Sequence, residues 1–142
     1  MMITRASWIA ALALGLLGCD NSSAGGTGAA GKDLRKFDSN GGSYAIELST
    51  SPAAIAVNQP FDVSVTVTPK KGAATDLEVL VDARMPAHFH GMNRTAKVTR
   101  GKDGTTWKAE GLVFHMPGHW ELYIDITQGG ATERAQLDVD LK

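Results

Sequence analysis

Hydrophobic and polar residues alternate along several segments of the chain from Tyr44 onward. In residues 61–68, 120–127 and 135–141 every second residue is apolar, and most of the residues between them are polar. A period of two residues places one face of a β-strand against a core and the other toward water. The pattern therefore predicts three amphipathic strands. Weaker signals of the same kind predict further strands at 44–50, 76–83, 94–100 and 105–113.

Short segments rich in Gly, Pro, Asn and Lys separate these strands and predict turns. About seven short strands at regular spacing, with no helical period between them, predict an all-β fold, namely an antiparallel immunoglobulin-like β-sandwich. A β-barrel is the alternative that this pattern leaves open. Residues 117–120 are expected to form a corner leading into the sixth strand, with Trp120 pointing into the core. Apolar packing must hold the two sheets together, because the chain has no cysteine beyond position 19.

The first residues have the organisation of a secretory signal. Arg5 supplies a short positive region, and residues 7–17 are apolar apart from one serine and one glycine. This run is too short to span a bilayer as a helix but fits the hydrophobic region of a signal peptide. It ends in Leu-Leu-Gly-Cys, which resembles the bacterial lipobox. Residues 1–18 are therefore predicted to be a lipoprotein signal peptide, with Cys19 as the lipidated first residue of the mature chain.

Cys19 is the only cysteine, so it has no disulfide partner within the chain. The alternative is an ordinary signal peptide with an incidental cysteine, and Leu17 is bulkier than the residue usually found at that lipobox position. Residues 19–43 are rich in Gly, Ser and Ala and are expected to form a flexible linker. This order predicts an extracytoplasmic domain at residues 44–142, anchored to the bacterial cell membrane through Cys19, on the periplasmic side in a Gram-negative cell.

The charge balance excludes one class of partner. Of the 14 basic residues, loss of Arg5 with the leader leaves 13, against 15 acidic residues. These basic residues form no stripe, so nucleic acid is not an expected partner.

All four histidines, and every methionine beyond the leader, lie between Met85 and His119. The first cluster reads MPAHFHGM at residues 85–92, and the second reads HMPGHW at residues 115–120. Imidazole nitrogen and thioether sulfur suit copper, and thioether favours Cu(I) over harder ions. Structural zinc sites usually include thiolate, while calcium and magnesium need clustered oxygen ligands, which neither cluster contains. The clusters therefore predict copper as the metal.

In an extended chain, His88, His90 and Met92 would share one face. Neighbouring residues of the second cluster would point to opposite sides, and its Pro-Gly turn could fold His119 back beside His115. Whether the two clusters meet depends on a topology that places both at one end of the sandwich. The expected metal ligands are two to four residues drawn from His88, His90, Met92, His115, Met116 and His119, with Met85 as a weaker candidate. Alternatively, Met92, Met116 and Phe114 fill one end of the core and the histidines remain in water.

The two clusters, together with Gly111–Phe114 and Glu121–Leu122, resemble the two signature segments of the YtkA-like domain family. That family is similar in outline to the immunoglobulin-like FixH and copper-resistance proteins. The resemblance covers about residues 44–141 and implies a small extracytoplasmic β-sandwich associated with copper delivery or oxidase assembly. It maps the first motif on His88, His90 and Met92, and the second on His115 and Met116. It implies no enzymatic activity.

The leading hypothesis is a lipid-anchored copper carrier or chaperone that passes its ion to a protein partner. The alternative is a non-metal accessory domain of the cell envelope that binds a protein partner. An enzyme is the third option and is not favoured, because catalysis by acid and base needs paired carboxylates around an enclosed pocket. The acidic residues of the strands are instead expected on a solvated sheet face; they include Asp62, Glu78, Glu121 and Asp125.

Overall fold

The computed structural model describes residues 33–142. The predicted signal peptide (residues 1–18), the lipidation site at Cys19 and most of the predicted linker lie outside the described residues. Within residues 33–142, no helix has the length and apolar character needed to cross a membrane.

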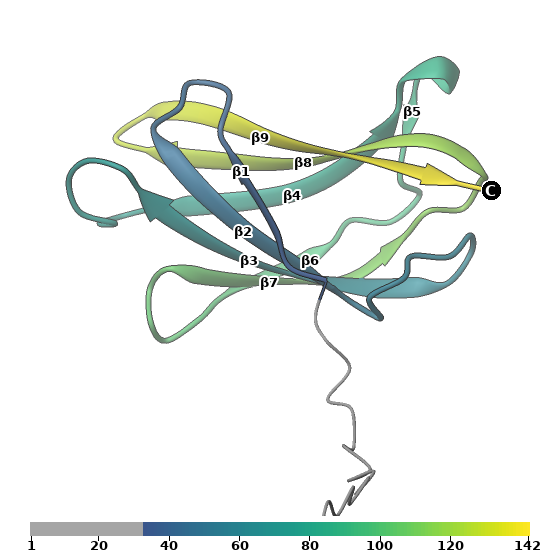
Figure 1. Ribbon diagram of the computed structural model, residues 1–142, viewed down its shortest axis with the longest axis horizontal. Coiled ribbons are helices and arrows are strands. Elements are labelled where there is room, and N and C mark those ends of the chain that lie inside the picture. Colours follow the sequence, from purple (N-terminus) through teal and green to yellow (C-terminus); the bar gives the residue numbers. More distant parts are fainter. Residues whose placement is uncertain (1–32) are drawn as a thin grey trace, which may run out of the picture.

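Nine strands and one short 3₁₀ turn make up the described part of the chain (Figure 1). They are β1 (Arg35–Asp38), β2 (Tyr44–Ser51), β3 (Pro60–Pro69), β4 (Glu78–Met85), η1 (Pro86–His88), β5 (His90–Gly91), β6 (Lys97–Arg100), β7 (Thr106–Val113), β8 (Gly118–Gln128) and β9 (Ala131–Leu141). One sheet has the order β1-β2-β3-β7-β6 and the other has the order β5-β4-β8-β9. All neighbouring strands are antiparallel. The prediction of an all-β sandwich is confirmed.

The apolar faces of the two sheets meet in one core, as the two-residue period predicts. In β3, the buried side chains are those of Phe61 and the three valines that follow at every second position. In β8, the buried positions begin at Trp120 and continue through alternating Leu and Ile residues to Ile126. Trp120 therefore points into the core, as expected from the corner before it. Each fully buried Leu, Ile or Val stabilises the fold by about 1.5–3 kcal/mol, so burial of these alternating side chains holds the two sheets together.

The structure differs from the prediction at the start of the domain. Residues Arg35–Asp38 form β1, although they fall within the predicted linker at residues 19–43. β1 pairs with β2, and Phe37 packs against the core while Lys36 forms an ion pair with Glu47 at 2.5 Å. The short strand carries only one large side chain toward the core, so its apolar signal is too weak to predict from sequence. The boundary expected at residue 44 lies too late.

The turn between β1 and β2 is fixed to the opposite sheet by a carboxylate. The side-chain oxygens of Glu133, in β9, accept hydrogen bonds from the hydroxyl group of Ser39 at 2.6 Å, from the hydroxyl group of Ser43 at 2.5 Å and from the Ser43 backbone N–H at 3.2 Å. These bonds lower the pKa of Glu133, the Ser39 contact contributing most. They join the first strand pair to the other sheet at the end of the sandwich near the β8–β9 turn.

Candidate metal centre

The first His/Met cluster lies where the chain reverses direction after β4. Met85 ends the strand with its side chain buried, and Pro86 begins the 3₁₀ turn, whose first position tolerates a residue without an N–H. Phe89 closes the turn in the left-handed region, with φ of 56°, and its N–H donates to the Pro86 carbonyl at 3.2 Å. The chain then returns along β4 as β5.

This reversal corrects one expectation. The cluster is not extended, so His88, His90 and Met92 do not share a face by simple alternation. His88 belongs to the turn and is exposed, whereas His90 belongs to β5 and is half-buried. The rings of His88 and His90 nevertheless lie close, with centroids 5.8 Å apart. The geometry of the turn brings the two rings together, and the spacing of the two histidines in the sequence did not predict this turn.

The second cluster lies at the corner between β7 and β8, and three contacts fix it. The rings of Phe114 and Trp120 stack with centroids 4.6 Å apart and an interplanar angle of 3°. The Trp120 indole N–H donates to the Met116 carbonyl at 3.0 Å, and the backbone N–H of Asn58 donates to the Phe114 carbonyl at 2.8 Å. Phe114 and Trp120 are buried, and His115 lies between them in the sequence, so the backbone of His115 is held rigidly.

The structure brings the two clusters together at one end of the sandwich. The ring of His115 lies 5.1 Å from that of His90, centroid to centroid, and 5.4 Å from that of Trp120. His90 also contacts Trp120 edge-on, at 6.1 Å. The question left open by the sequence therefore has an answer: β4, β5 and the β7–β8 corner meet at the same pole, and three imidazoles from two segments gather beside one buried indole.

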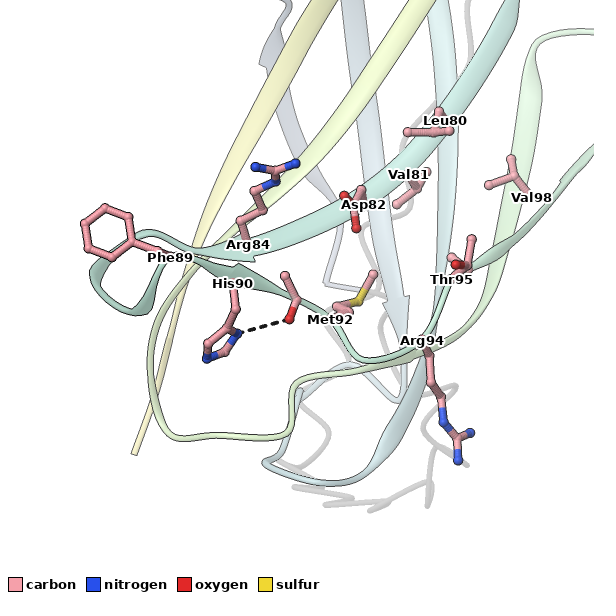
Figure 2. A pocket seen from close by; sticks show the side chains of 12 residues that line it. Leu80, Val81, Asp82, Arg84, Phe89, His90, Met92, Arg94, Thr95 and Val98 are labelled. Carbon is pink, nitrogen blue, oxygen red and sulfur yellow. Dashed lines mark hydrogen bonds between the residues drawn. The ribbon is translucent and has the colours of Figure 1, made fainter.

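The hydrogen bonds of these rings leave nitrogen atoms free. In His90, Nδ1 lies 3.1 Å from the Gly91 carbonyl oxygen, and because that oxygen can only accept, Nδ1 is the donor in this bond (Figure 2). Fixing one ring nitrogen by a backbone carbonyl is how metal-binding histidines are usually oriented. In His115, Nδ1 is buried and has no hydrogen-bond partner. A buried polar atom without a partner costs about 1–3 kcal/mol, so this end of the fold carries an uncompensated polar group.

The methionines near this cluster differ in their surroundings. Met85 is buried in the core. Met92 and Met116 are only partly buried and pack against the edge of the core. The backbone N–H of Met92 donates to the Ala83 carbonyl at 3.2 Å, which ties the residue after β5 to β4. Two thioethers thus lie at the border between the core and the surface on the two segments that carry the histidines.

His119 does not join this cluster, and the expectation that it folds back beside His115 is wrong. Residues alternate along β8, so Trp120 takes the inward position and His119 points outward. Its Nδ1 lies 2.9 Å from a side-chain oxygen of Asp140 on β9, and this contact raises the pKa of His119. Potential ligand atoms of His119, Glu121 and Asp138 also lie within 4.8 Å of one another, on the outer face of the β8–β9 pair.

Two acidic residues considered from the sequence have structural partners. The Asp62 carboxylate lies 3.0 Å from the Lys108 ammonium group and accepts the Gly111 N–H at 3.1 Å. These contacts lower the pKa of Asp62, the lysine contributing most. Asp125 accepts two hydrogen bonds from the Arg134 guanidinium, at 2.7 and 2.8 Å. Both carboxylates lie on strands and belong to ion pairs at the surface of the sheets.

Fold and site together define a small antiparallel β-sandwich protein with histidines of two separate segments gathered at one pole. The family described as YtkA-like matches residues 38–125, which is more than half of the chain. The chain belongs to this family, and the match includes both His/Met clusters. No curated protein and no solved structure matches the chain.

Proposed function

We propose that this chain is a copper-binding module that carries Cu(I) and passes it to a protein partner. The observation that carries the proposal is the meeting of His88, His90 and His115 at one pole, with ring centroids 5.1 and 5.8 Å apart. The buried Nδ1 atom of His115 supports it, since a bound ion would compensate a nitrogen that otherwise lacks a partner. Because Nδ1 of His90 bonds the Gly91 carbonyl, Nε2 is the nitrogen of that ring which would bind the ion.

The donor set favours copper over other ions. His88, His90 and His115 supply imidazole nitrogens, and the partly buried Met92 and Met116 supply thioethers on the same two segments. Mixed imidazole and thioether ligation suits both oxidation states of copper, and thioether selects the softer Cu(I). Neither of the two segments that carry these donors, residues 85–92 and 115–120, contains a carboxylate, which disfavours calcium and magnesium.

Each histidine contributes to carriage in a different way. His115 sits on the rigid corner and would hold the ion, with Trp120 as the residue that positions it. His90 is oriented by its hydrogen bond to the Gly91 carbonyl. His88 is exposed on the 3₁₀ turn, so it is the ligand that a partner can replace first. Lipid anchoring at Cys19 would keep this carrier at the outer side of the cell membrane, and the proposal assigns it no catalysis.

Competition for Cu(I) tests this function. The full chain is titrated against a chromogenic Cu(I) chelator, and the His88→Ala/His90→Ala and His115→Ala variants are compared with it. We expect one-to-one binding that is lost in both variants. His119→Ala is the matched control, since it removes a histidine outside the ring cluster, and it should bind as the parent does. Absence of competition by the parent, or equal loss in the control, would contradict the proposal. The non-metal accessory domain would then be the better account.

A further inference from the structure

One edge of strand β4 is open over most of its length. On one side β4 pairs with β8 from Glu78 to Arg84. On the other side it pairs only with the two residues of β5, at Arg84 and Met85. Within the described part of the chain, no strand pairs with β4 on that side before Arg84. An open edge presents unpaired backbone donors and acceptors, and such edges are templates for an added strand.

The residues whose backbone groups point to this edge follow from the register. The Ala83 carbonyl accepts the Met92 N–H, so the polar groups of Ala83 point away from β8. Hydrogen-bonded and non-hydrogen-bonded pairs alternate along an antiparallel ladder. Val81 and Val79 therefore also direct N–H and C=O toward the open edge. The Ala83 N–H is not free, because the Asp82 carboxylate accepts it at 2.8 Å. The open groups are those of Val79 and Val81.

A cleft of about 480 Å³ runs along this edge (Figure 2). β4 forms one border, and the segment from β5 to β6 forms the other, including Met92, Thr95 and Val98. Large hydrophobic side chains are exposed at only three positions in residues 33–142, and two of them line this cleft: Leu80, 56% exposed, and Phe89, 98% exposed. The volume lies within the range of sites that take small ligands or short peptides.

The charges of the cleft favour an acidic occupant. Arg84 from β4 and Arg94 from the segment after β5 both line it, and neither guanidinium forms an ion pair among the described residues. The one carboxylate in the lining, that of Asp82, is turned to the backbone of Ala83. Arginine recognises carboxylates through two parallel hydrogen bonds, and these two arginines are free to do so.

We propose that this cleft binds an extended segment of a protein partner in which apolar and acidic residues alternate. The segment adds to the open edge of β4 through the backbone of Val79 and Val81. Its apolar side chains take the inner face and contact Met92 and Val98, with Phe89 at the border of the cleft. Its carboxylates take the outer face, which Arg84 shares on β4, and pair with Arg84 and Arg94. Main-chain bonds give affinity and side-chain pockets give specificity in this kind of recognition. A concave cleft beside an unpaired edge suits a peptide better than a flat lipid surface. The inference needs no bound metal, although His90 lines the same cleft.

Synthetic peptides test the inference directly. A fluorescein-labelled octapeptide alternating valine and glutamate, and a matched octapeptide with lysine in place of glutamate, are titrated into the full chain and followed by fluorescence anisotropy. We expect the acidic peptide to bind and the basic peptide to bind at least about tenfold more weakly. The Arg84→Glu/Arg94→Glu variant should reverse this preference, because like charges in contact are strongly unfavourable. Leu34→Ser, which removes the third exposed apolar residue, is the matched control and should change nothing.

A second measurement separates strand addition from charge attraction alone. An acidic peptide with N-methyl groups at alternate residues cannot donate the backbone hydrogen bonds, so it should bind at least about tenfold more weakly. In NMR spectra of the protein, the amide signals of Val79 and Val81 should shift only with the unmodified peptide. Binding of neither peptide, or shifts confined to other strands, would overturn the inference. Dimerisation through this edge would also overturn the inference. If the dimer is lost in Arg84→Glu/Arg94→Glu, the cleft binds a second copy of the chain. Anionic phosphatidylglycerol vesicles that bind the parent but not this variant would assign it to lipid.

Discussion

Replacing Phe89 by asparagine should stabilise the domain, although it removes a large apolar side chain. Phe89 is 98% exposed and adopts the left-handed conformation, with φ of 56°. Bulky residues rarely occupy this region, whereas asparagine is several-fold enriched there. The perturbation therefore exchanges a side chain that contributes no burial for one that suits its backbone.

The magnitude follows from two terms. A phenylalanine carries about 150–250 Å² of surface, so a residue exposed to 98% loses only about 0.1 kcal/mol of burial when it is replaced. Left-handed backbone costs an ordinary residue about 1–2 kcal/mol, and asparagine recovers part of this cost. We expect a net gain of about 0.5–1 kcal/mol in the free energy of unfolding. For a domain of this size, the gain corresponds to a rise in Tm of roughly 2–8 °C.

Urea and thermal unfolding of the full chain, followed by circular dichroism, measure this change. The midpoint should rise with an unchanged m-value, which identifies a change in stability rather than in compactness. Phe89→Val is the control, because a β-branched residue is strained further at positive φ and should lower the midpoint. A lower midpoint for Phe89→Asn would refute the argument, and it would mean that Phe89 packs against the fold. The same variant should bind the acidic peptide more weakly, since stability and binding oppose each other at this position.

Three further predictions concern the neighbouring strand β8. Pairing with Asp140 raises the pKa of His119 above 6.5. The stabilising effect of this pair is therefore complete below about pH 6.5 and is lost as the pH rises through the folded-state pKa. In urea unfolding from about pH 5 to 8.5, His119→Gln should lose less stability over this window than the parent protein does. Gly118→Ala should cost about 1–3 kcal/mol in urea unfolding, because its φ is 121° and a Cβ would lie 2.6 Å from Met85 Cε. In a Met85→Ala background the same substitution should cost less, by the part due to the clash. Trp120→Phe removes the indole N–H that donates to a backbone carbonyl, so it should lower the free energy of unfolding by about 1–3 kcal/mol. It should also weaken Cu(I) binding in the chelator competition, and an unchanged affinity would show that the indole does not position the site.

The alternation along the chain was sufficient to predict the fold. All seven expected strands are present, and their ends differ from the expected ones by at most four residues. β9 begins at Ala131 rather than at residue 135, since β8 and β9 pair up to Gln128 and Ala131. One physical reason explains why the sequence did not predict β1 and β5. A strand of four or two residues has too few positions to display a period, and its formation depends on the partner strand.

The site was predictable in residue type but not in arrangement. The His/Met clusters named the residues of the candidate site, but the meeting of His90 with His115 depends on strand order, which local spacing does not encode. His119 was misplaced because a Pro-Gly pair suggested a fold-back, whereas the demand to bury Trp120 fixed the register of β8. The open edge of β4 had no signal in the sequence, because it follows from the shortness of β5.

The two segments of the candidate metal centre differ in how firmly the fold holds them, and this difference suits a carrier. In the sequence His115 lies between Phe114 and Trp120, whose buried rings stack on each other. It lies on a corner where the carbonyls of Phe114 and Met116 both accept hydrogen bonds. His88 lies on an exposed turn, and His90 lies in the two-residue strand that joins this turn to the sheet. Segments with few buried contacts and few backbone bonds open at a small fraction of the free energy of global unfolding. Ligand exchange would therefore proceed by movement of the first segment while His115 stays in place, and the open edge of β4 would bring a partner's segment to the side that moves.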